Sequence, residues 1–396
     1  MRVRRTLCRC HYVGVTRQRL AEIPGFNIDR VAAAAGDDPE VLRMENLDTD
    51  LPVPPDVVEA TRAAVGDDDA NSWLPFDGKI EMKEAVADHI EMRSGIRYDP
   101  AREVVITSGE GDAMLNSLFV ATDPGDEVIV TDPTYAGMIN RVRLVGAVPR
   151  LVPLIPQDSG WRLDVESLHR SVGPRTRAVF IMNPSLPTGC TLNQDEWDAI
   201  ANVCRESDAW LIYVSMYEGV VYDDLPIVHP SALPDMRDRV IIAGSVSLEQ
   251  RMIGWRVGWT VGAESLHSDL SVVQIYNSLV PSGIGQAGAR VALGAPPEDL
   301  RAAVAEFQRR RDETVRQLEG FPIVTASGGW SLLMDTAALG IDCAEASARM
   351  LEHKVAATQM RGWGGDVADR YLRFVFSNEP VDRLASLGER ARRALT

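Results

Sequence analysis

The 396-residue chain contains carboxylates, phenols and guanidinium groups that could transfer protons and bind anions. Glu110 is a carboxylate, while Tyr135 and Tyr217 are phenols, and both kinds of side chain can act in general acid–base catalysis. Arg256 and Arg373 could each bind an anionic oxygen, because a guanidinium holds a carboxylate through two parallel hydrogen bonds. Such a set of side chains suits proton transfer on an anionic substrate.

One segment fixes the family that the chain resembles. Ser245–Trp259 reads S-V-S-L-E-Q-R-M-I-G-W-R-V-G-W, which resembles the S-x-S-K-x-x-x-x-x-G-x-R-x-G-[YW] signature of the class I/II aminotransferases of fold type I. In that family the lysine forms an imine with pyridoxal phosphate (PLP). Leu248 stands at this position, and a leucine cannot form an imine. The resemblance therefore indicates a divergent member that lacks the lysine.

Further motifs follow in the order of the family, from about Val41 to the C-terminus. T-S-G-E-G-D-A at 107–113 resembles the turn that opens a helix whose N-terminal amides receive the PLP phosphate. N-P-S-L-P-T-G at 183–189 resembles N-P-x-N-P-T-G, and Y-E-G-V-V-Y-D at 217–223 resembles the end of D-E-x-Y-x-x-L-x-Y-D. The resemblance implies that Tyr135 stacks on an aromatic ring and that Arg373 binds a substrate carboxylate.

The departures from the family fall on the positions that contact the cofactor. Val214 replaces the aspartate that pairs with the pyridine nitrogen, and Leu186 replaces the asparagine that bonds the phenolic oxygen. Trp73 replaces a tyrosine that reaches a phosphate, and Glu110 stands where small neutral residues meet the phosphate. Unpaired polar groups on the ring would cost about 1–3 kcal/mol each. We therefore expect no bound PLP, with Leu248, Val214 and Leu186 as degenerate cofactor positions.

The expected function is then that of an aminotransferase-fold enzyme without PLP. It would catalyse cyclisation, dehydration or isomerisation of a small carboxylate-bearing metabolite in specialised biosynthesis, by general acid–base chemistry. The expected catalytic residues are Glu110, Tyr135 and Tyr217, and the expected substrate-binding residues are Arg373, Arg256, Trp73, Asn183, Ser245 and Ser247. Two alternatives stay open, namely a non-catalytic partner protein and an aminotransferase whose lysine is inactivated. No metal is expected.

Glu110 and Arg256 are expected to form a partly buried ion pair. The family pairs the equivalent of Arg256 with a phosphate dianion, and Glu110 is the nearby negative group that the sequence offers in its place. Breaking a buried pair would cost about 3–5 kcal/mol.

The elements that must position these residues read as an α/β fold. β-rich runs at 103–107, 127–131, 177–182, 210–214 and 240–243 alternate with amphipathic stretches, which is typical of a mostly parallel sheet flanked by helices. A long helix is expected over 297–318, followed by strands within 321–334 and 371–376. We expect an N-terminal arm and part of a small domain over 1–55, a large domain over 56–284, and a small α+β domain over 285–396.

Composition limits the partners. Acidic residues outnumber basic ones, 57 against 41, and the resulting net charge of −16 disfavours nucleic acid. No apolar run reaches the roughly 18 residues that a membrane span needs. We expect a cytoplasmic protein, and the family resemblance implies a homodimer.

Overall fold

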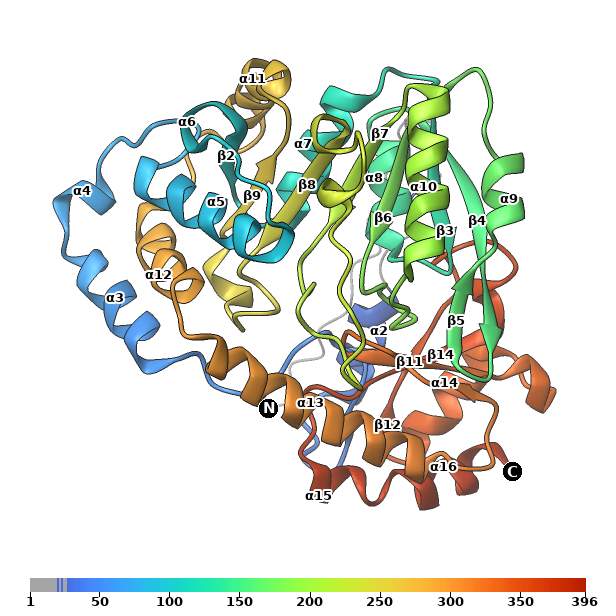
Figure 1. Cartoon of the computed structure of the whole chain (residues 1–396). Helices are drawn as coiled ribbons and strands as arrows, with labels where there is room; N and C mark the ends of the chain where they lie inside the picture. The colour runs from blue at the N-terminus through green and yellow to red at the C-terminus, as the bar shows by residue number, and fades with distance from the viewer. Residues whose placement is uncertain (1–19, 21–22, 24–26) are drawn as a thin grey trace, which may run out of the picture.

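The computed structural model describes residues 20, 23 and 27–396, and these form a large and a small α/β lobe (Figure 1). The first part of the expected N-terminal arm lies outside the described residues. The long helix α13 (Pro297–Gln317) runs from the large lobe along the small one. A proline at its first turn suits a helix start, because proline lacks the amide hydrogen that would have no partner there.

The large lobe is built on an eight-stranded sheet with the order β2-β9-β8-β7-β6-β3-β4-β5. Its central strands β8, β7, β6, β3 and β4 run parallel, while β9 and β5 are antiparallel to their neighbours. The strands are β2 (Val104–Thr107), β3 (Glu127–Asp132), β4 (Val148–Gln157), β5 (Gly160–Leu163), β6 (Thr176–Met182), β7 (Trp210–Val214), β8 (Val240–Ser245) and β9 (Gly258–Val261). The five runs predicted from the sequence are confirmed as β2, β3, β6, β7 and β8.

Helices cover both faces of this sheet, with α10 in front of β6 and β7 and α8 behind (Figure 1). The helices of this lobe are α3 (Pro55–Val65), α4 (Asp68–Asn71), α5 (Ile80–Ser94), α6 (Pro100–Glu103), α7 (Glu110–Ala121), α8 (Ala136–Leu144), α9 (Val165–Arg170), α10 (Gln194–Ser207), α11 (His267–Asn277) and α12 (Gly283–Leu293). A capping box between Asn193 and Glu196 fixes the start of α10, since each side chain bonds the other residue's amide.

The small lobe contains a four-stranded antiparallel sheet with the order β10-β11-β14-β13. Its elements are β10 (Ile323–Val324), β11 (Ser331–Asp335), α14 (Cys343–Glu352), β12 (Val355–Ala356), β13 (Thr358–Gln359), β14 (Tyr371–Val375), α15 (Val381–Leu384) and α16 (Leu387–Leu395). The N-terminal segment joins this lobe, because β1 (Leu42–Arg43), which follows α2 (Asn27–Ala35), pairs with β12. The stretch expected as a strand over 321–334 is divided into β10 and β11 by residues 325–330, where Gly328 forms an isolated bridge with Val221.

The parallel strands deliver distant parts of the chain to one edge of the large sheet. The carboxyl ends of β6, β7 and β8 lead into the segments that contain Leu186, Val214 and Leu248. Ligands of open α/β sheets bind at this edge, so the fold places the candidate site there. No helix within the described ranges is long and apolar enough to cross a membrane.

Candidate active site

The turn before α7 forms one end of the site. Gly109 has a φ of +94°, a conformation that glycine adopts without strain, and Gly258 of β9 packs directly on its backbone. A Cβ on Gly258 would lie 2.6 Å from the carbonyl carbon of Gly109, and a Cβ on Gly109 would lie 2.3 Å from Nη2 of Arg256. The absence of both Cβ atoms lets the Arg256 guanidinium lie beside the helix N-terminus, where amide hydrogens favour an anion.

Two serines at the end of β8 link the charged groups of this turn. Ser245 Oγ donates to Glu110 Oε2 at 2.7 Å and accepts from the Ser247 amide at 3.1 Å. Ser247 Oγ accepts from Arg256 Nη1 at 3.4 Å. Arg256 makes no ion pair with any described residue, so the expected Glu110–Arg256 pair is wrong. The serines lie between the two charges and provide each with a hydroxyl partner instead.

Arg373 forms the opposite end of the site on β14. Its side chain is fully buried, and Nη2 donates to the backbone oxygen of Glu45. Nε and Nη1 have no hydrogen-bond partner among the described residues. Burial lowers the pKa of Arg373 to about 10, although Tyr217, Glu45 and Tyr135 favour the charged form. Two unpartnered donors on a buried cation destabilise the folded protein unless an anion accepts hydrogen bonds from them.

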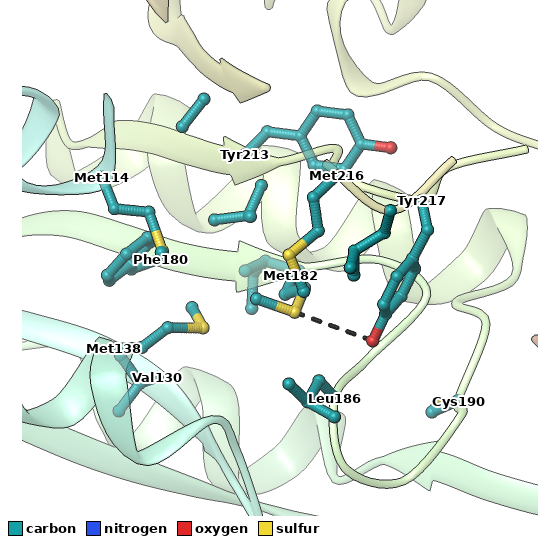
Figure 2. Packing of buried hydrophobic residues seen from close by; sticks show 14 of the residues in the cluster. Met114, Val130, Met138, Phe180, Met182, Leu186, Cys190, Tyr213, Met216 and Tyr217 are labelled. Carbon is teal, nitrogen blue, oxygen red and sulfur yellow. Dashed lines mark hydrogen bonds between the residues drawn. The ribbon is translucent and has the colours of Figure 1, made fainter. Parts of the chain in front are cut away.

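Tyr217 stands between these two ends. It is buried, and its hydroxyl donates weakly to the Sδ of Met182 at 4.0 Å (Figure 2). Burial raises the pKa of Tyr217 well above its usual range; Arg373 opposes this rise and Glu110 adds to it. The phenol therefore keeps its proton and can donate a hydrogen bond to an anionic oxygen.

An apolar wall lies beside Tyr217. Leu186, Val214 and Leu248 are all buried, and Figure 2 shows Leu186 near Met182 and Tyr217. Val214 is the last residue of β7, while Leu186 and Leu248 belong to the loops that follow β6 and β8. These three side chains carry no polar group that could bond a ring nitrogen or oxygen.

A loop of the small lobe covers the Arg373 end. Trp363 lies over the Arg373 guanidinium, and its ring centroid is 5.7 Å from that of Tyr135. The Trp363 carbonyl accepts from the Thr134 amide at 2.8 Å, and the Gly365 amide donates to Asp132 Oδ2 at 3.1 Å. These contacts tie the small lobe to the end of β3. Sequence reasoning missed Trp363 and Asp132, although the glycines around Trp363 were a signal of a tight loop.

Two other predicted site residues, Asn183 and Trp73, make contacts that serve the local fold and not the site. Asn183 is buried, and its Oδ1 accepts from the Leu192 amide at 2.8 Å, so it shapes the loop after β6. Trp73 is 71% exposed after α4, and its ring contacts Phe76. Within the described chain, the structure shows no hydrogen bond or ring contact from Trp73 to the other predicted site residues. The structure thus brings together Glu110, Ser245, Ser247, Arg256, Tyr135, Tyr217 and Arg373.

The comparisons with known proteins agree on one family. The family model of aminotransferase class I and II matches residues 42–386. An aspartate aminotransferase of Rhizobium meliloti (strain 1021) is 31% identical over 291 residues, which are 73% of this chain and 70% of the relative. An arginine–pyruvate transaminase of Pseudomonas aeruginosa is 30% identical over 351 residues, which are 86% and 87% of the two chains.

Solved structures extend the likeness to the whole fold. The structure of an N-succinyldiaminopimelate aminotransferase from Mycobacterium tuberculosis superposes with a TM-score of 0.87 at 29% identity. The match covers 96% of this chain and 98% of that one. An aspartate aminotransferase from Thermus thermophilus with maleate gives a TM-score of 0.88 at 27% identity, over 96% and 99% of the two chains.

These comparisons overturn two expectations from the sequence, namely PLP-independent acid–base catalysis and the absence of PLP. The relatives are named as aminotransferases, which points to transamination with PLP. They equally disfavour the non-catalytic alternative. The expectations were wrong because they counted the lost contacts at Leu248, Val214 and Leu186 and gave little weight to the contacts that remain.

The remaining contacts fit the phosphate of PLP. Gly109 and Gly258 let Arg256 lie beside the N-terminus of α7, and Arg256, Ser245 and Ser247 supply a guanidinium and two hydroxyls. Leu248 offers no amine, so the fit is to a cofactor held without a covalent bond. The apolar wall would contact the faces and edge of a ring.

Proposed function

Since the chain belongs to the class I and II aminotransferase family, we propose that it acts on a small amino acid or keto acid and uses noncovalently held PLP. The observation that carries this proposal is the pair of unpartnered nitrogens on fully buried Arg373. A substrate carboxylate would accept hydrogen bonds from these free N–H groups and would balance the buried positive charge.

The described residues divide the work between the two ends of the site. Arg373 binds and orients the substrate carboxylate, while Trp363 covers the guanidinium and excludes water. Arg256, Ser245 and Ser247 would hold the PLP phosphate. When bound, PLP supplies an electron-withdrawing ring that permits exchange of an α-amino group. Buried Leu186, Val214 and Leu248 would provide apolar contacts to the ring between the two ends.

In this proposal, Tyr135, Tyr217 and Glu110 donate hydrogen bonds or transfer protons. The raised pKa of Tyr217 makes it a hydrogen-bond donor throughout the physiological range, next to Arg373. The Tyr135 ring contacts the Trp363 ring, with 5.7 Å between their centroids. Glu110 is the carboxylate of the predicted catalytic set, and its bond to Ser245 holds it at the phosphate end. Leu248 can neither give nor accept a proton, so slow amino-group transfer is expected.

The proposal also includes a cytoplasmic homodimer. Trp73 and Tyr276 are large apolar side chains with 71% and 87% exposure, which a second copy would cover. Cys190, Cys204 and Cys343 are free and buried, as suits a reducing compartment. Light scattering of the purified protein measures the assembly, and a monomer at micromolar concentration would contradict this part.

The test of the proposed function measures PLP binding and amino-group transfer in three proteins: wild type, Leu248→Lys and the volume-conserving control Leu248→Met. We expect wild type and Leu248→Met to bind PLP reversibly, with no adduct after borohydride treatment. Leu248→Lys should retain a reduced adduct at residue 248 by mass spectrometry, and should transfer a labelled amino group faster. Absence of saturable PLP binding in all three proteins would overturn the proposal.

A further inference from the structure

We propose that Glu110 is an internal carboxylate that competes with phosphorylated ligands for the anion-binding end of the site. The inference rests on the proposed function, in which this end receives the PLP phosphate. It assigns Glu110 a role that the comparisons do not assign, that of a residue that sets the affinity of the site for phosphate.

The hydrogen bonds of Ser245 support this assignment. Its hydroxyl donates to Glu110 Oε2 at 2.7 Å, so its proton is already used by a carboxylate. A hydroxyl has a single proton, so Ser245 has no further donor for a phosphate, and its oxygen also accepts from the Ser247 amide. A phosphate that binds Ser245 must therefore displace Glu110 from it.

The charges around the turn strengthen the competition. Arg256 contacts Ser247 and the Ser108 carbonyl, and Arg141 of α8 donates to the Gly111 carbonyl at 2.9 Å. Two guanidiniums thus face the turn, and two carboxylates oppose them. Asp112 accepts from the Ser108 amide and the Ser278 hydroxyl and stays outside the serine pair. Only Glu110, among the described acidic residues, is bonded to the serines.

The physical consequence is a lowered affinity for anions. A phosphate dianion beside Glu110 meets like charge in a partly enclosed place, and this repulsion offsets the attraction of Arg256. A ligand without a phosphate group does not meet this penalty. Removal of the Glu110 charge should therefore favour phosphorylated ligands selectively.

The experiment compares wild type, Glu110→Gln, Glu110→Ala and the control Asp112→Asn. Equilibrium dialysis gives the affinities for PLP and for pyridoxal, which lacks the phosphate, and thermal shift gives stabilisation by inorganic phosphate. We expect both Glu110 variants to bind PLP about tenfold or more tightly than wild type. Their affinity for pyridoxal should be unchanged, and inorganic phosphate should stabilise them more than wild type. Asp112→Asn should change PLP affinity much less.

The outcomes separate the two proposals. Unchanged or weaker PLP binding by both Glu110 variants, with saturable binding by wild type, overturns the competition and leaves the proposed function standing. A larger phosphate stabilisation in the Glu110 variants, with no PLP binding by any protein, supports the competition and overturns the proposed function. An equal gain in Asp112→Asn would overturn the specific role of Glu110, because it would reflect net charge alone.

Discussion

The Arg373 guanidinium carbon lies 4.7 Å from the centre of the Trp363 ring, so an aromatic face covers one side of a buried cation. Trp363 belongs to the loop before β14, and Arg373 belongs to the strand itself. A tryptophan face attracts a guanidinium by about 0.5–2 kcal/mol. The contact restricts the plane of the guanidinium and leaves the N–H groups of Nε and Nη1 without a partner among the described residues.

Arg373→Lys should weaken the binding of a carboxylate substrate analogue by roughly 10- to 100-fold, because an ammonium cannot make two parallel bonds in one plane. The melting temperature should change little. Calorimetric titration and thermal unfolding on the same variant measure both effects, with Arg393→Lys, in an exposed ion pair, as the control. A lower melting temperature with unchanged affinity would show that Arg373 serves the fold alone.

Gly109→Ala should weaken phosphate binding as well as the fold. The positive φ of Gly109 costs an alanine about 1–2 kcal/mol, and the new Cβ would push the Arg256 guanidinium away. Gly320→Ala is the matched control, since Gly320 has a φ of +88° and nothing within 4 Å of an added Cβ. Chemical denaturation should show similar losses of stability in both variants, whereas only Gly109→Ala should lose affinity for PLP. Equal affinities would contradict the assignment of the turn.

Glu249→Gln should lower the free energy of unfolding by about 3–5 kcal/mol. Glu249 follows Leu248 and forms a buried ion pair with Arg93 of α5, so its loss leaves a buried cation without its partner. Glu389→Gln breaks a pair whose side chains are about two-thirds exposed and should cost no more than about 1 kcal/mol. Urea denaturation of both variants measures the difference. A loss below 1 kcal/mol in Glu249→Gln would show that the pair does not hold the Leu248 loop in place.

Asp132→Asn should remove a pH dependence of stability. Burial raises the pKa of Asp132 to about 6, and Asp369 and Asp366 add to the rise against the opposing amides of Gly365 and Ala368. The folded state therefore holds this proton more tightly than the unfolded state. Stability is lost as the pH rises from about 4 to about 6, by up to about 3 kcal/mol.

The Asp132→Asn variant should accordingly be more stable than wild type at pH 7, and the difference should vanish near pH 4. Urea denaturation across this range measures it, with Asp195→Asn at an exposed helix start as the control. A constant difference between wild type and Asp132→Asn would disprove the raised pKa.

The sequence predicted the fold well because its signals are local. The run 210–214 is made of aliphatic and aromatic residues, of which the last four are buried, because parallel strands are covered on both faces. Because β6, β7 and β8 are parallel neighbours in one sheet, as the family resemblance implies, their carboxyl ends lie at the same edge. The motif positions therefore place the segments of Leu186, Val214 and Leu248 at one edge of the sheet, whereas Trp73 is exposed and lies outside this group.

The pairing of polar groups could not be predicted in the same way. Charge balance suggested a pair between Glu110 and Arg256, but the hydroxyls of Ser245 and Ser247 lie between them. Glu249 is bonded to Arg93, which lies 156 positions away in the chain. Which polar groups bond one another depends on the reach and burial of their side chains, and the spacing of residues in the sequence does not determine these. The inference about PLP failed for a related reason, since it treated lost contacts as decisive for a ligand that several elements hold.

In the parallel strands β6, β7 and β8, the residues that stabilise the fold and the residues that face the site lie at different places along the chain. Each strand contributes its buried body to folding, and its end or the loop after it to the site. Substitutions at these positions can exchange a polar group for an aliphatic one while the hydrogen-bonded ladders between the strands stay intact. Such a scaffold allows the site to change one segment at a time without loss of the sheet.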